Sequence, residues 1–140
     1  MTIVYKSKVG NELVIPLTLV FVVTLFMAIF NEPHWPGLAI LLPVILFIVH
    51  MFSTTYYTVD GDVLKVKCGF LYNAEIDIKT IKKISETNNP ISSPALSLDR
   101  LDITYNKYDN VIISPKDKAE FISALTALNP NIEVKLKSVK

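Results

Sequence analysis

Two long apolar segments near the N-terminus constrain this chain more than any other feature of its sequence. Leu13 to Phe30 and Trp35 to Phe52 each hold eighteen residues without Asp, Glu, Lys or Arg. Only residues 31–34 separate the two segments. Helices of this length and composition can cross a bilayer, because a helix satisfies its own backbone hydrogen bonds in lipid. We therefore predict a flank at 1–12 and a transmembrane hairpin at 13–52, with helices at 13–30 and 35–52.

The first apolar segment could instead belong to a cleaved signal peptide, because Lys6 and Lys8 precede it. Two features favour a retained helix. The segment is long for the apolar part of a signal peptide, and no small residues in a cleavage pattern follow it at 30–33. We therefore prefer the retained hairpin, and with it an integral membrane protein with two spans.

Lysines that flank the two segments predict their orientation. Lys6 and Lys8 precede the first segment, and Lys65 and Lys67 follow the second. Residues 31–34 hold one charged side chain, that of Glu32. Because lysine-rich flanks stay on the inner side of a membrane, we expect both termini and the rest of the chain in the cytoplasm.

Residues 53–140 have the composition of one small domain. The chain holds 14 Lys and Arg against 13 Asp and Glu, and two of each precede residue 53, so this part carries a net charge of +1. That balance lacks the basic surface typical of nucleic-acid binders. A single cysteine, Cys68, excludes an internal disulfide and a multi-cysteine metal site. Its phase with Leu64 and Val66 predicts a buried thiol.

From Thr54 onward the apolar residues alternate with a period of two, which is typical of strands with one buried and one solvent-exposed face. The dipeptide Asp60-Gly61 predicts a tight hairpin turn between the first two strands. Residues 87–94 are rich in Asn, Pro and Ser and predict a loop. A change of phase predicts a turn or bulge at Asp99-Arg100. The predicted strands lie at 54–59, 63–68, 74–79, 81–85, 95–98, 101–105 and 111–113.

A single amphipathic helix is predicted at 115–128. Ser114 is a suitable N-cap, Pro115 suits the first helical position, and apolar residues then recur at helical spacing. Residues 131–140 alternate briefly and predict either a terminal strand or a frayed tail. About seven antiparallel strands in a curled sheet or partial barrel, capped by one C-terminal helix, describe the architecture of pleckstrin-homology-like (PH-like) domains. We therefore predict a PH-like domain of mostly β or α+β class at 53–140.

The segment 92–105 (SSPALSLDRLDITY), followed by 111–115 (VIISP) and Phe121, resembles a bacterial family of PH-like domains. Members of that family often carry two membrane helices at the N-terminus. The resemblance covers most of 13–128 and implies a bacterial inner or cell membrane as the location. It implies no established activity, so it strengthens the prediction of the fold more than that of the function.

The best candidate ligand site is a group of hydroxyls and one guanidinium that could hold an anionic group such as a phosphate or a terminal carboxylate. Its members are Ser92, Ser93, Ser97 and Arg100. In the competing interpretation, the serines bond the local backbone. Arg100 would then pair with Asp99 or Asp102.

The sequence offers no grouping that indicates catalysis, a cofactor or a metal. His34 and His50 have no carboxylate or cysteine at ligand spacing, and no histidine lies in the segment of Cys68. The four glycines are isolated and form no phosphate-binding loop. We therefore predict that the chain is not an enzyme and binds no cofactor.

These observations predict a membrane-anchored, non-catalytic interaction module. It would bind a protein or peptide at the membrane surface, for example by strand addition at an exposed sheet edge. The alternative is a module that binds anionic lipid headgroups through Arg100 or through lysines. The lysines form two clusters: Lys79, Lys82 and Lys83, and Lys135, Lys137 and Lys140. The oligomeric state and the identity of the partner stay open.

Overall fold

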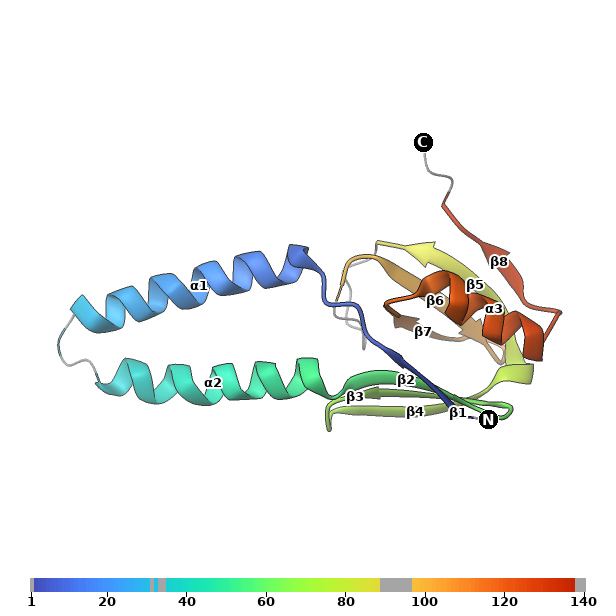
Figure 1. Cartoon of the computed structure of the whole chain (residues 1–140), viewed down its shortest axis with the longest axis horizontal. Helices are drawn as coiled ribbons and strands as arrows, with labels where there is room; N and C mark the ends of the chain where they lie inside the picture. The colour runs from blue at the N-terminus through green and yellow to red at the C-terminus, as the bar shows by residue number, and fades with distance from the viewer. Residues whose placement is uncertain (1, 31, 33–34, 89–96, 138–140) are drawn as a thin grey trace.

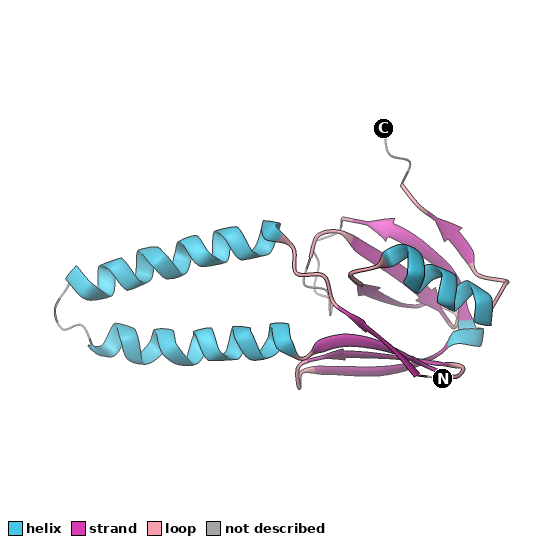
Figure 2. Ribbon diagram, in the orientation of Figure 1, coloured by secondary structure: helices cyan, strands magenta, loops and turns pink. Residues whose placement is uncertain are grey.

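Two long helices project side by side from one end of a β-rich domain (Figures 1 and 2). The computed structural model describes residues 2–30, 32, 35–88 and 97–137. Helix α1 spans Asn11–Phe30 and helix α2 spans Trp35–Ser53, within two residues of the predicted bounds. The predicted helical hairpin is therefore present.

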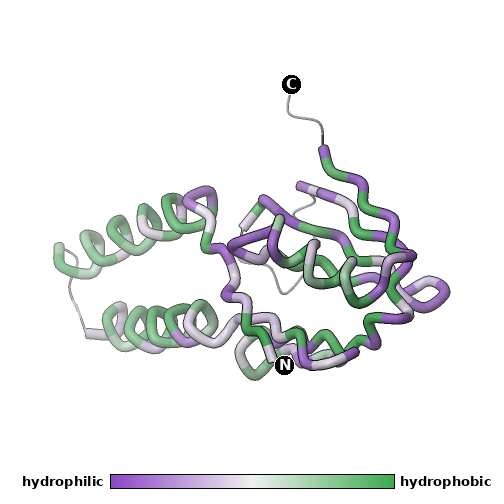
Figure 3. Tube along the Cα trace, turned by 45° about the vertical axis from the view of Figure 1, so that its right-hand side comes forward, coloured by the Kyte–Doolittle hydropathy of each residue, from purple (hydrophilic) through white to green (hydrophobic). Residues whose placement is uncertain are grey.

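Both helices consist mainly of hydrophobic residues along their whole length (Figure 3) and bury almost none of them within the protein. In the most apolar window of each helix, 0% of the residues of α1 and 6% of those of α2 are buried. A core helix of a soluble domain would be mostly buried, whereas a helix in lipid needs no protein cover. Length, composition and exposure thus fit two membrane spans.

The residues before α1 form a strand, although we had predicted a flank at 1–12. Strand β1 (Thr2–Lys6) pairs antiparallel with β2 (Thr55–Asp60), with Tyr5 opposite Tyr57. The hairpin is therefore inserted between two neighbouring strands of one sheet, and both of its ends meet the domain on the same side (Figure 1). Cleavage after α1 would separate β1 from its sheet, which counts against a signal peptide.

Two four-stranded sheets make up the domain, and within the described residues they do not close into a barrel. The first sheet has the order β1-β2-β3-β4, and the second has the order β7-β6-β5-β8. The 3₁₀ helix η1 (Ile78–Thr80) connects them. The remaining strands are β3 (Val63–Cys68), β4 (Tyr72–Asp77), β5 (Ile81–Thr87), β6 (Arg100–Tyr105), β7 (Asp109–Ile113) and β8 (Glu133–Lys135).

Within the described part of the C-terminal segment, Glu133–Lys135 form the strand β8. Strand β8 pairs in parallel with β5, with Val134 opposite Ile84. We had predicted antiparallel strands, so the second sheet differs from the prediction at this edge. The strand predicted at 95–98 lies partly outside the described residues, and 97–98 form a bend. The bend continues through Asp99, so the chain turns directly before Arg100, as the predicted turn requires. The register irregularity of the sheet lies in β5, between Ile81 and Lys83.

Helix α3 spans Lys118–Leu128 and begins three residues later than predicted. Pro115 forms an antiparallel bridge with Ser7, and the Lys116 N–H donates to the Lys6 carbonyl at 3.0 Å. These pairings keep the chain extended past Pro115, so the helix starts only after Asp117. The helical spacing of the apolar residues nevertheless predicted this helix correctly, because these residues are buried in the core.

The core lies between the two sheets, and α3 covers one end of it (Figure 2). Phe121 of α3 is fully buried, and its ring meets the ring of Tyr5 edge-on at 5.2 Å and that of Tyr57 at 6.4 Å. Cys68 is buried, as predicted. Fully enclosed side chains from both sheets and from η1 complete the core: Leu64, Val66, Ile76, Ile78, Ile84, Leu101, Ile103 and Ile113.

Candidate functional site

Two of the four predicted ligand residues are buried: Ser97 in the bend before β6, with an exposed fraction of 0%, and Arg100 at the first residue of β6, with 5%. The Arg100 Nε donates to the Ser97 carbonyl, and the Ser97 hydroxyl accepts from the Asp99 N–H at 3.2 Å. Ser92 and Ser93 lie outside the described residues. An anion site at these four residues stays a prediction. Ser97 behaves as the competing interpretation expects, with a bond to local backbone.

Asp99 pairs with lysines and not with Arg100, contrary to that competing interpretation. Its carboxylate meets the Lys8 ammonium at 2.9 Å and the Lys118 ammonium at 2.5 Å. Lys118 also binds Glu86, so it bridges α3, β5 and the bend before β6. Lys8 belongs to the segment that leads into α1. This cluster therefore ties the start of the hairpin to the far sheet.

The lysine contacts shift the pKa values of both carboxyls. Hydrogen bonding to Lys118 lowers the pKa of Glu86 below its ordinary value. Burial alone would raise the pKa of Asp99, but bonds from Lys118 and Lys8 outweigh it and lower that pKa. Both acids are therefore ionised at neutral pH and stabilise the fold in that form.

Acidification is expected to destabilise the domain through this cluster. A carboxyl whose folded pKa is lowered contributes stability above its unfolded pKa and loses it as the pH falls through the folded pKa. The urea midpoint of the full chain in nonionic detergent should therefore fall as the pH drops below about 5. Near-ultraviolet circular dichroism reports this unfolding, because all six tyrosines lie outside the hairpin.

Lys118→Met provides the control for this pH dependence, because it keeps most of the side-chain length and removes the shared donor. The variant should have a lower urea midpoint than the wild type at pH 7, and its urea midpoint should fall less steeply as the pH is lowered. An equally steep decline in the variant would show that other carboxyls cause the acid sensitivity.

A second set of polar contacts surrounds the buried hydroxyl of Tyr57 on β2. This hydroxyl donates to the Ser7 Oγ and accepts from the Ser114 N–H, each at 3.1 Å. The Lys8 N–H donates to the Ser114 carbonyl at 2.7 Å. Burial raises the pKa of Tyr57, so the hydroxyl stays protonated. These bonds join the segment before α1 to both sheets.

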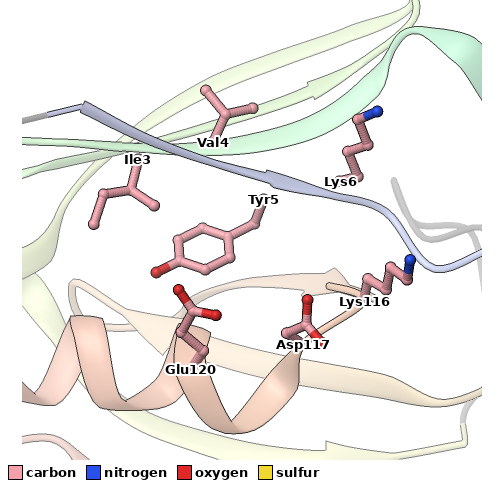
Figure 4. A pocket seen from close by; sticks show the side chains of 7 residues that line it. All are labelled: Ile3, Val4, Tyr5, Lys6, Lys116, Asp117 and Glu120. Carbon is pink, nitrogen blue, oxygen red and sulfur yellow. The ribbon is translucent and has the colours of Figure 1, made fainter.

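A groove opens between β1 and the start of α3, on the side of β1 that does not pair with β2 (Figure 4). It has a volume of about 310 Å³. Side chains of both signs surround it: Lys6 and Lys116 toward the hairpin, and Asp117 and Glu120 on the helix side. Ile3, Val4 and Tyr5 complete its lining.

Tyr5 contributes a buried hydroxyl to this groove. The residue is 6% exposed, and its hydroxyl has no hydrogen-bond partner within the part of the chain that the structure describes. Figure 4 shows the hydroxyl directed toward the carboxylate of Glu120, but the two form no hydrogen bond. Burial raises the pKa of Tyr5, and the charge of Glu120 raises it further. A buried polar group without a partner is rare enough to require an explanation.

The backbone of β1 is also open along the groove. The Lys6 carbonyl accepts from the Lys116 N–H, and just after the strand the Lys8 N–H donates to the Ser114 carbonyl. The even-numbered residues therefore direct their backbone N–H and carbonyl groups away from β2. Backbone direction alternates along a strand, so Val4 and Thr2 face the same side. Among the described residues, pairing on this side of β1 ends at Lys6. A free N–H and carbonyl at Val4 thus border the groove.

The comparison with known families decides what kind of domain surrounds this groove. Residues 55–129, more than half of the chain, match the family described as bacterial PH domain. The chain belongs to the bacterial PH domain family. No curated protein and no solved structure matches it. Bacterial PH domains are generally non-catalytic interaction modules, which agrees with the kind of function predicted from the sequence.

The match to the bacterial PH domain begins at the first residue of β2 and ends just after α3. It includes the helical wall of the groove, but β1 and the hairpin precede it. The strand wall of the groove, β1, therefore lies outside the matched residues.

The groove was not predicted from the sequence, because we predicted no strand within residues 1–12. One signal was available, since residues 2–6 (TIVYK) combine β-branched and aromatic residues in a short alternating run. Of the two histidines, His50 lies exposed in the last turn of α2 and His34 lies outside the described residues.

Proposed function

We propose that this chain is a membrane-anchored, non-catalytic module that binds an extended segment of a partner protein in the groove between β1 and α3. The observation that carries the proposal is the buried Tyr5 hydroxyl, which lacks a hydrogen-bond partner among the described residues and lies beside a strand edge that is unpaired within them. An added peptide strand supplies both missing groups. Its backbone pairs with Val4, and one of its carbonyls accepts from Tyr5.

The charges of the groove favour a particular kind of peptide. Asp117 and Glu120 lie on the helix side, with Glu120 next to the Tyr5 hydroxyl, and they attract a basic side chain. Lys6 and Lys116 lie nearer the hairpin and attract an acidic one. The preferred ligand is therefore an extended segment with an acidic and a basic residue on the side that faces α3. Opposite charges of this kind fix the register of the added strand.

We place the groove on the cytoplasmic face of the membrane, following the lysines beside the hairpin. Lys6, Lys8, Lys65 and Lys67 all belong to the domain end of the protein, and the opposite end of the hairpin carries Glu32. Anchoring raises the effective concentration of the groove for membrane-associated partners. Cleavage of the domain by protease added to intact cells would contradict this orientation.

The alternative, a reader of anionic lipid headgroups, has weaker support from the lysine positions. Lys79 follows β4 at the end of the domain away from the hairpin, and its ammonium pairs with Asp62 at 2.7 Å. Lys135 pairs with Glu133 at 3.2 Å. Lysines that are paired or distant from the anchoring membrane contribute little attraction to it.

Photo-crosslinking in native membranes tests the peptide proposal. A photoreactive side chain replaces Lys116, which lines the groove, in the otherwise unchanged full-length chain. We expect a discrete crosslinked product with a segment of a membrane-associated protein. Val4→Pro removes the free N–H of β1 without affecting its bonds to β2, because proline is tolerated on a free edge. The product should fall by up to about tenfold, the effect of one lost hydrogen bond.

The matched control is Val4→Ala, which keeps the free N–H and should retain the product. A second control places the photoreactive side chain at Tyr108, which is 85% exposed in the β6–β7 turn. Equal yields from Val4→Pro and Val4→Ala, or the same product from position 108, would overturn strand addition at β1.

A further inference from the structure

The turn between β3 and β4 presents two large apolar side chains beside the end of α2. Phe70 is 70% exposed and Leu71 is 64% exposed, although both belong to a tight turn of three residues. The turn is close to the helix. The Phe70 ring lies 6.0 Å from the ring of Phe47 and 6.0 Å from that of His50.

Gly69 fixes this turn against α2. Its φ of +56° lies in the left-handed region, which favours glycine. A Cβ at this position would overlap the sulfur of Met51. The backbone of the turn therefore approaches the last turns of α2 more closely than any other residue would allow, and the two following side chains are held beside the helix.

The level of the turn along α2 coincides with the boundary of a bilayer. The 19 residues of α2 extend about 28 Å, close to the ~30 Å of a hydrocarbon core. Phe47 and His50 lie six and three residues before the end of this helix at Ser53, or about 9 and 4.5 Å along its axis. Amphipathic elements that lie on membranes bury their apolar faces to about 5–10 Å, which is the same depth.

We infer that the Phe70–Leu71 turn inserts into the acyl-headgroup boundary of the membrane that holds α1 and α2. The occupant of this apolar surface is lipid, because the surface is continuous with the exposed apolar side of α2 through Phe47. The turn is a third point of membrane contact besides the two spans. Together the three contacts fix how the domain is tilted against the bilayer, and they do so whether or not the groove binds a peptide.

Tryptophan fluorescence of the full chain in vesicles tests this inference. Trp35 is the single tryptophan and lies at the other end of the hairpin, so Trp35→Phe provides a silent background. Phe70→Trp in this background places the probe at the turn. In phosphatidylcholine vesicles we expect emission at short wavelength, strong quenching by lipids with brominated acyl chains, and weak quenching by iodide in the buffer.

The matched control is Tyr108→Trp in the same background, at an exposed turn of the same domain at the end away from the hairpin. Brominated lipids should quench Phe70→Trp severalfold more than Tyr108→Trp, and iodide should show the reverse order. Equal quenching of the two proteins by brominated lipid, with equal access to iodide, would overturn the insertion. Near-ultraviolet circular dichroism confirms that both proteins are folded, so a negative result counts against the inference itself.

Discussion

Phe121→Ala is expected to lower the free energy of unfolding by about 3–5 kcal/mol, the range for truncating a fully buried phenylalanine. The side chain of Phe121 packs against Tyr5 and Tyr57 from the first sheet, so its loss leaves a cavity where α3 meets that sheet. Small domains are stable by about 5–15 kcal/mol, so this one change removes much of the total. Urea unfolding in nonionic detergent, followed by near-ultraviolet circular dichroism, measures the effect.

Leu128→Ala is the matched control on the same helix, because Leu128 is 41% exposed at the last residue of α3. We expect a loss below about 1 kcal/mol for this partly exposed side chain. Similar losses for the two variants would mean that α3 contributes through its helicity and not through the aromatic contacts of Phe121.

Tyr57→Phe is expected to lower the stability of the domain and Tyr5→Phe is not, although each change removes one buried hydroxyl. The Tyr57 hydroxyl donates to Ser7 and accepts from the Ser114 N–H, so its removal should cost about 1–3 kcal/mol. The Tyr5 hydroxyl has no partner among the described residues, so its removal should leave stability unchanged or raise it by up to about 1 kcal/mol.

Measuring both the urea midpoint and the crosslink yield of the Tyr5→Phe variant relates stability to binding. The variant should unfold at the same or a higher urea concentration than the wild type, yet yield less of the crosslinked product at position 116. A variant that is destabilised like Tyr57→Phe would mean that the Tyr5 hydroxyl already has a partner in the folded protein. The role of this hydroxyl in the proposed groove would then be lost.

The hairpin and α3 could be predicted from the sequence because local patterns decide them. Eighteen mainly apolar residues without Asp, Glu, Lys or Arg predict a helix long enough to span a bilayer from length and composition alone. Phe121, Ile122 and Leu125 recur at helical spacing, and all three are buried. The start of α3 was wrong by three residues because Pro115 pairs with Ser7, more than a hundred residues earlier. Local capping signals contain no information about such a contact.

Strand β1 and the groove could not be predicted by the same reasoning. Five residues beside a long apolar segment give a weak alternation, and their partner β2 follows about fifty residues later. The predicted anion site illustrates the same limit, because the sequence indicates that Arg100 and Asp99 are neighbours but not that Lys8 and Lys118 bind the acid. The unpartnered Tyr5 hydroxyl becomes evident only when every surrounding side chain has a position.

The insertion of the hairpin between β1 and β2 has a consequence for biogenesis. Strand β1 is synthesised before β2, so it can pair only after β2 has left the ribosome and, with α1 and α2 as membrane spans, after both helices have inserted. If a single helix inserted, the two strands would end on opposite sides of the lipid, and the first sheet would lack its edge.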